Sequence, residues 1–190
     1  MSPSVLPTPA EQIPIVDLSL PASQIRAELL SSCKHWGFFY LVNHGLSPAS
    51  LARLWELTRT FFSLPLCQKS AAGAWDGAEN AGYRPLLPRV PKEQFDMRKW
   101  PSRPEAGAYV QPLPAYLEEN REFLDGFKRE CAALGGRVLG YLALALGLEE
   151  GYFGERHVYE EPSMDNFELM HCALSPSPSP PSLGLTTKRG

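Results

Sequence analysis

The chain has 190 residues, 44% of them hydrophobic, which is enough to bury one hydrophobic core and favours a single domain. Its 18 Lys and Arg are interspersed with 21 Asp and Glu, and the net charge of −3 argues against a nucleic-acid-binding surface. There is no basic segment followed by an apolar core at the N-terminus, and the longest apolar run, residues 141–148, is too short to span a bilayer, so we expect a soluble cytoplasmic protein.

The first predicted elements are a strand and a helix. Residues 1–12 are expected to be a flexible N-terminus. Residues 13–19, IPIVDLS, alternate branched apolar residues with turn formers at both ends, which favours a short strand. From Pro21 the spacing becomes helical, and Gly37 stands where a helix C-terminus needs a residue that tolerates positive φ. The predicted buried stripe of this helix comprises Ile25, Leu29, Cys33 and Trp36.

A second strand and a second helix follow. Residues 38–42, FFYLV, form an unbroken apolar and aromatic run that predicts a strand buried on both faces. His44 lies in the NHG turn after it and is interpreted as a structural residue. Ser47 followed by Pro48 is a strong helix start, and this helix should end before Pro65. Its predicted buried face comprises Leu51, Leu54, Trp55, Thr58, Phe61 and Phe62.

The remainder of the chain alternates between a loop region and a long helix. Residues 66–114 contain recurrent Gly and Pro, which predicts loops and short extended pieces such as EQFDMRKW. Apolar residues then recur every three or four positions and predict a long amphipathic helix that is broken or loosened near Gly135 and Gly136 and closed at Gly147. A short helical turn is expected at residues 149–154.

No motif in these segments assembles an active site. The sequence has no glycine-rich phosphate-binding motif, no G-x-S-x-G and no H-E-x-x-H, and its four histidines lack a partner at metal-ligand spacing. The four cysteines are far apart and should be reduced thiols, and the first three, Cys33, Cys67 and Cys131, are expected to be small buried hydrophobes, unlike Cys172. Composition and residue spacing alone therefore predict only a domain with helices around a small sheet.

Several ordered segments resemble a known family. HWGFFYLVNHG, AGYRPLLP, KEQFDM and LALGLEEGYF follow one another as in the N-terminal region of the isopenicillin N synthase-like, non-haem iron(II) and 2-oxoglutarate-dependent dioxygenases. The resemblance implies an α+β fold, with residues 13–165 as the N-terminal helix and strand region. Residues 166–172 would be a remnant of the first strand of a double-stranded β-helix, or jelly roll, whose barrel is incomplete. It also implies an oxidoreductase that hydroxylates or desaturates a small secondary metabolite.

The cofactors implied by the resemblance are iron(II) and 2-oxoglutarate. Such enzymes hold iron with two histidines and one carboxylate, of which the first two ligands form H-x-D, and anchor 2-oxoglutarate with R-x-S. Neither pattern occurs in these 190 residues, so we expect this chain to hold no metal, cofactor or catalytic residue and to be inactive alone.

The resemblance ends abruptly after residue 172. Where the family continues as L-R-L-x-H-Y-P-P, this chain has FELMHC and then ALSPSPSP, and His171 is interpreted as an ordinary strand residue. Residues 173–190 are expected to be a disordered Ser/Pro-rich tail. Truncation, alternative splicing or a shifted reading frame would each explain the change.

Tyr83 and Arg84 are the candidate substrate-binding residues. They follow Gly82 in an expected exposed loop, and the resemblance implies that such loops approach the mouth of the active site, where a guanidinium can clamp a carboxylate. A solvated loop arginine is the alternative. For the whole chain, the alternative function is a non-catalytic product that binds a protein partner through exposed apolar surface.

Overall fold

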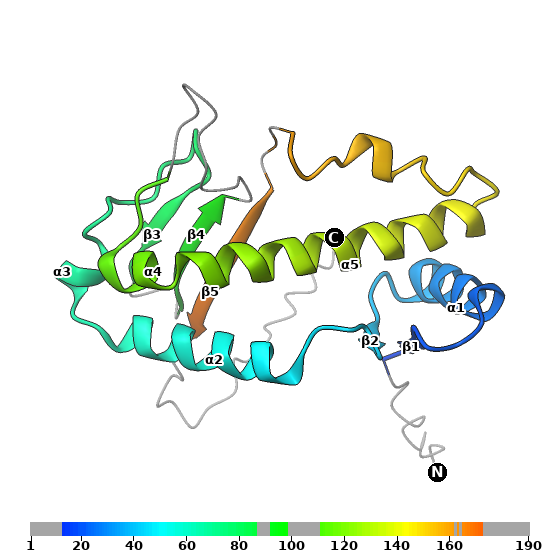
Figure 1. The fold of residues 1–190 in the computed structure, drawn as a ribbon, viewed down its shortest axis with the longest axis horizontal. Helices are drawn as coiled ribbons and strands as arrows, with labels where there is room; N and C mark the ends of the chain where they lie inside the picture. The colour runs from blue at the N-terminus through cyan, green and yellow to red at the C-terminus, as the bar shows by residue number, and fades with distance from the viewer. Residues whose placement is uncertain (1–12, 87–91, 99–110, 162, 164, 173–190) are drawn as a thin grey trace, which may run out of the picture.

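A computed structural model of the chain describes residues 13–86, 92–98, 111–161, 163 and 165–172. The long helix α5 (Arg121–Ala145) runs along the molecule and joins two hydrophobic cores (Figure 1). A three-stranded sheet packs toward one end of α5, and a two-stranded sheet with helix α1 packs toward the other. The predicted segments 1–12 and 173–190 lie outside the described residues.

The N-terminal unit is a strand, a helix and a second strand. Strand β1 (Ile15–Asp17) pairs in parallel with β2 (Tyr40–Val42), and α1 (Ala22–His35) connects them. Val16, Ile25 and Leu29 are buried, together with Leu18, against partly buried residues of α5. The predicted strand and helix are therefore confirmed, with slightly tighter bounds.

The prediction that residues 38–42 are buried on both faces is wrong. Only residues 40–42 form a strand, and the side chains of Phe38 and Tyr40 are 53% and 59% exposed. Phe39 and Leu41 pack against the apolar cluster of β1, α1 and α5, whereas the side chains between and beside them are exposed, so one face of this segment is covered. An apolar run alone did not distinguish a strand with two covered faces from a strand with one.

The prediction of buried cysteines is also wrong. Cys33 and Cys67 are exposed and Cys131 is partly buried. The buried face of α1 includes Leu29 and Ser32, which are three positions apart. Cys33 therefore lies on the side of the helix that faces solvent.

Helix α2 (Pro48–Ser63) begins and ends where predicted. The hydroxyl oxygen of Ser47 accepts hydrogen bonds from the backbone N–H groups of Ala49 and Ser50, so the N-cap satisfies donors that the first helical turn leaves free. Thr58, Phe61 and Phe62 are buried as predicted, and Leu57 joins them. Trp55 is 67% exposed, which contradicts its assignment to the core.

A three-stranded antiparallel sheet is built largely from the region predicted as loops. It has the order β3 (Gly82–Arg84), β4 (Lys92–Arg98), β5 (Asn166–Cys172) and follows a short helix, α3 (Leu66–Lys69). The central strand β4 pairs with β5 over seven residues, so residues 93–98 of the extended piece expected at EQFDMRKW lie in the middle of the sheet, and its last two residues lie outside the described residues. β5 spans the residues for which a strand is expected; its identity as the first strand of a jelly roll stays a prediction.

The long helix is interrupted at another place than predicted. Helix α4 (Ala115–Glu119) ends at Asn120, whose side-chain amide donates to the backbone carbonyl of Tyr116, and α5 then continues through Gly135 and Gly136. A glycine lowers helix propensity by about 1 kcal/mol, which the packing of α5 outweighs. Gly147, with φ of +76°, closes the segment as predicted. A short 3-10 helix, η1 (Gly154–Arg156), follows.

The described residues thus form a mixed α+β fold without a closed barrel, as expected. Within the same residues, no helix combines the length and apolar character needed to cross a membrane.

Candidate functional site

Polar side chains gather on both faces of the β3-β4-β5 sheet. Successive side chains of a strand point to opposite faces, so Glu93 lies on the same face as the buried Phe95 and Met97, which pack toward α2 and α5. We call this the core face. Gln94 and Asp96 lie on the opposite, outer face.

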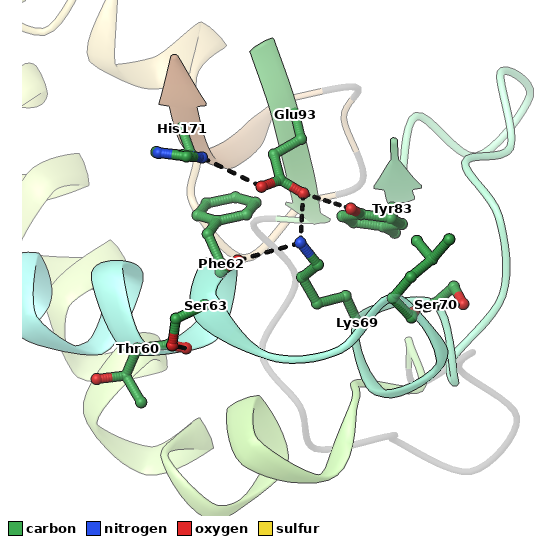
Figure 2. A network of polar contacts seen from close by, with 9 residues as sticks. Thr60, Phe62, Ser63, Lys69, Ser70, Tyr83, Glu93 and His171 are labelled. Atoms are coloured by element: carbon green, nitrogen blue, oxygen red, sulfur yellow. Dashed lines mark hydrogen bonds and ion pairs between the residues drawn. The ribbon is translucent and has the colours of Figure 1, made fainter. Parts of the chain in front are cut away.

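The polar cluster on the core face is centred on Glu93 (Figure 2). Its Oε2 atom accepts hydrogen bonds from the Lys69 ammonium at 2.6 Å and from the Tyr83 hydroxyl, and its Oε1 atom lies 3.1 Å from Nδ1 of His171. A carboxylate oxygen only accepts, so Nδ1 of His171 carries the proton in this contact. Lys69, Tyr83, Glu93 and His171 form the Glu93 network.

Burial and hydrogen bonding oppose each other at Glu93. Burial is the largest effect and raises the pKa of Glu93, but hydrogen bonds from Lys69, Tyr83 and His171 together outweigh it and hold the pKa below its ordinary value. Burial, and then the hydrogen bond to Glu93, raise the pKa of Tyr83. Near neutral pH the carboxylate is therefore ionised and the phenol is protonated.

The Glu93 network connects β4 with four other elements. The Lys69 ammonium of α3 also donates to the backbone carbonyl of Phe62 at the end of α2, and the network continues to β3 and β5. The ring of His171 stacks on that of Phe62 with 5.8 Å between centroids. His171 is a strand residue as predicted, but its partner Glu93 is 78 positions away, and no sequence pattern indicated it.

Tyr83 is buried in this network, with its hydroxyl held by Glu93. A contact between Tyr83 and a substrate stays a prediction. His44 accepts a hydrogen bond from the backbone N–H of Leu46 through Nδ1, which agrees with its interpretation as a structural turn residue.

The Glu93 network does not fit an iron site. Glu93 and His171 are potential ligands, but both carboxylate oxygens already accept hydrogen bonds, one of them from the Lys69 ammonium. In the part of the chain that the structure describes, no three His, Cys, Asp or Glu side chains gather as metal ligands would. The described residues therefore do not supply a two-histidine, one-carboxylate centre.

The outer face of the sheet carries a cavity of about 490 Å³, within the usual range for small-molecule sites. We call it the outer cavity. Polar and charged side chains from all three strands line it: Arg84, Lys92, Gln94, Asp96, Asn166 and Glu168.

Asp96 is the buried centre of the outer cavity. Its carboxylate accepts a hydrogen bond from the Asn166 amide at 3.2 Å and weaker contacts from the Gln94 amide at 3.5 Å. Nε of Arg84 lies 3.0 Å from the same carboxylate, an ion-pair distance, although its N–H is not aligned for a hydrogen bond. These groups compensate the buried charge and hold Arg84 in place.

Arg84 belongs to β3 and not to the predicted exposed loop. Its guanidinium lies over the ring of Trp75, 3.8 Å from the centroid, and its side chain remains 40% exposed. Gly82 permits this arrangement because it has φ of +112° and because an added Cβ would approach the Ala74 carbonyl oxygen to 2.7 Å. The sequence indicated Arg84 as a candidate, but not the ion pair and the ring that orient it.

A second cavity, of about 540 Å³, lies between α5 and the segment before β5. Its lining includes Leu139, Phe167 and the thiol of Cys131, whose pKa is raised by burial and by Glu130. A raised pKa disfavours the reactive thiolate. The outer cavity, where charged groups from three strands converge, is the better candidate for a functional site.

Comparison with known proteins identifies a family that matches more than half of the chain. Residues 13–112 match the family described as "non-haem dioxygenase in morphine synthesis N-terminal". Flavonol synthase/flavanone 3-hydroxylase of Arabidopsis thaliana is 34% identical over 167 residues, which cover 80% of this chain and 48% of that protein. Jasmonate-induced oxygenase 2 of the same plant is 31% identical over 169 residues, which cover 77% of this chain and 42% of that protein.

Solved structures share the fold. JOX2 in complex with 2OG, Fe and JA superposes with a TM-score of 0.61 and 27% identity, over 84% of this chain and 51% of that one. A 2OG-Fe(II) oxygenase family protein from Caulobacter crescentus superposes with a TM-score of 0.63 and 25% identity, over 75% of this chain and 51% of that one. The chain therefore spans about half the length of the proteins that it matches.

Proposed function

The chain belongs to the 2-oxoglutarate- and iron(II)-dependent oxygenases, of which it represents the N-terminal region, and we propose that the whole enzyme oxidises a small metabolite partly bound in the outer cavity. The observation that carries this proposal is the placement of Arg84. Asp96 and Trp75 fix the guanidinium, while 40% of the Arg84 side chain remains exposed and the residue lines the outer cavity. Such a preorganised cation suits a carboxylate or another acceptor of the substrate.

Iron(II) and 2-oxoglutarate are the proposed metal and co-substrate of the whole enzyme. Support comes from relatives, since JOX2 was solved with 2OG and Fe. The 190 residues contain neither H-x-D nor R-x-S, and the described residues do not fit an iron centre. We therefore propose that this chain contributes a substrate-binding wall and does not catalyse the reaction by itself.

Turnover of 2-oxoglutarate tests the catalytic part of this proposal. The purified chain is incubated with iron(II), ascorbate and 2-oxoglutarate labelled at C1, and released carbon dioxide is counted. We expect no release above background, while a full-length relative assayed in parallel supplies the positive control. Release by the chain alone would overturn the claim that it lacks the metal centre.

Binding of a simple carboxylate tests the role of Arg84. Titration with hexanoate, followed by NMR chemical-shift changes, should perturb residues of the outer cavity. Arg84→Gln should weaken this binding about tenfold, as expected for the loss of one charge-assisted contact. Arg59→Gln, an exposed arginine on α2, is the matched control and should leave it unchanged. Equal hexanoate affinity of the two variants would contradict an anion-binding role.

A specific observation favours a second function, binding of a protein partner. Ile15, Phe38, Tyr40 and Val42 are exposed apolar side chains on or beside the β1-β2 sheet. Parallel sheets are normally covered on both faces, and two strands alone make a weak sheet. We propose as occupant a polypeptide that adds a β-strand with apolar side chains to this sheet.

Partner binding is tested by isolating a complex of fixed stoichiometry from the source cells. Tyr40→Lys should abolish the complex, because it places a charge in the proposed contact. Trp55→Lys alters an equally exposed aromatic residue elsewhere and should leave the complex intact. Failure to find a stoichiometric complex, or equal loss with both variants, would refute this second function.

A further inference from the structure

The charges of the outer cavity are balanced but separated. Two cations, Arg84 and Lys92, and two anions, Asp96 and Glu168, line it, so its net charge is zero. Arg84 and Asp96 pair with one another. Among the described residues, no ion pair or side-chain hydrogen bond is found for Lys92 or Glu168. The cavity therefore holds one uncompensated group of each sign.

Strand register places these groups at different ends. Lys92 pairs with Cys172 and lies at the start of β4, whereas the side chain of Arg84 extends from its position opposite Gln94 to Asp96. Asp96 and Glu168 are direct cross-strand neighbours four positions further along. At about 3.3 Å per residue, Lys92 and Glu168 originate about 13 Å apart along the sheet. Both side chains are long and can turn inward toward a ligand of moderate length.

A ligand of one charge would fit this cavity poorly. An anion bound at Lys92 would leave the exposed carboxylate of Glu168 without a partner and would gain no contact from it. A cation at Glu168 would leave Lys92 in the same position. An uncharged apolar ligand would desolvate both groups without compensating either. Only a ligand with an anionic and a cationic end satisfies the two residues together.

We propose that the outer cavity selects a bipolar small molecule, with a carboxylate or similar acceptor toward Lys92 and an ammonium or similar donor toward Glu168. This inference rests on the proposed function and names the substrate class of the same site. The Gln94 amide lies between the two ends and can bond to polar atoms in the middle of such a ligand.

A series of probes of equal chain length tests this proposal on the full chain. The probes are 6-aminohexanoate, which carries both charges, hexanoate, hexylamine and 1-hexanol, and binding is followed by NMR chemical-shift changes. We expect 6-aminohexanoate to bind about tenfold more tightly than hexanoate or hexylamine, because each end adds one charge-assisted contact. Hexanol should bind most weakly.

Variants assign the two ends. Lys92→Gln should reduce the affinity for 6-aminohexanoate to that for hexylamine, and Glu168→Gln should reduce it to that for hexanoate. Lys34→Gln and Glu149→Gln change exposed charges outside the cavity and are the matched controls. Near-ultraviolet circular dichroism verifies that each variant remains folded.

The outcomes separate this inference from the proposed function. If hexanoate binds as tightly as 6-aminohexanoate and the binding depends on Arg84, the bipolar selection is overturned while the anion-binding role stands. If no probe perturbs the outer cavity, both proposals fail. Tighter binding of 6-aminohexanoate that both cavity variants weaken, and neither control variant weakens, supports the bipolar selection.

Discussion

Replacing Glu93 by Gln should strongly destabilise the fold, because it leaves a buried ammonium without its counter-ion. The side chains of Lys69 and Glu93 are only 10% and 9% exposed, and the carboxylate accepts hydrogen bonds from three side chains. Breaking a buried ion pair by removing one partner costs about 3–5 kcal/mol. The Gln amide oxygen can still accept from one donor, so we expect a loss of about 3 kcal/mol in the free energy of unfolding.

The effect should depend on pH in a defined direction. The pKa of Glu93 in the folded chain lies below its ordinary value of 4.5, so ionised Glu93 stabilises the fold above that pH. This contribution is lost as the pH falls through the folded pKa. The difference between wild type and Glu93→Gln should therefore be constant from pH 6 to 8 and shrink below about pH 4.5.

Urea unfolding followed by tryptophan fluorescence measures these differences. Glu130→Gln, an exposed glutamate on α5, is the control and should change the free energy of unfolding by less than about 0.5 kcal/mol. The double variant Lys69→Met with Glu93→Gln removes both charges and should be more stable than Glu93→Gln alone by about 1–2 kcal/mol. A pH-independent loss of under about 1 kcal/mol for Glu93→Gln would refute the network's role in stability.

Three further substitutions probe local geometry through the same unfolding measurement. Gly82→Ala should cost about 2 kcal/mol or more, because φ is +112° and the new Cβ would meet the Ala74 carbonyl oxygen; a neutral result would contradict the close approach of these segments. Gly135→Ala on α5 should instead stabilise by about 0.5–1 kcal/mol, since nothing lies within 4 Å of the added Cβ. Ser47→Ala should cost about 1 kcal/mol through loss of the α2 cap, and Ser47→Asp should retain most of it.

Local signals predicted the elements that depend on a few adjacent residues. Ser47 and Pro48 marked the start of α2, Pro65 its end, and the left-handed glycine at 147 closes the segment after α5. Caps, proline rings and positive φ act within one turn of the chain, so a sequence pattern reports them directly. The ordered segments also indicated the oxygenase family before any geometry was known.

Burial was predicted less well, because periodicity does not show what covers a face. Trp55 follows the helical spacing of α2 but is exposed to solvent, and Tyr40 in β2 and the preceding Phe38 are exposed because only one face of this segment is covered. Strand β4 was predicted only as an extended piece, since its polar and apolar residues alternate within a Gly- and Pro-rich region. It becomes the central strand through pairing with β5, which begins 68 residues after β4 ends at Arg98.

The sequence by itself determined where α2 begins and ends, which residues can form the strand at 166–172, and the family to which the chain belongs. Only the tertiary structure decided that Glu93 meets Lys69 and His171 on one face of the sheet, and that Arg84 meets Asp96 on the other. The physical reason is distance along the chain. A cap or a turn is made by neighbours, whereas an ion pair across a sheet depends on strand register, and register is set by the packing of the whole core.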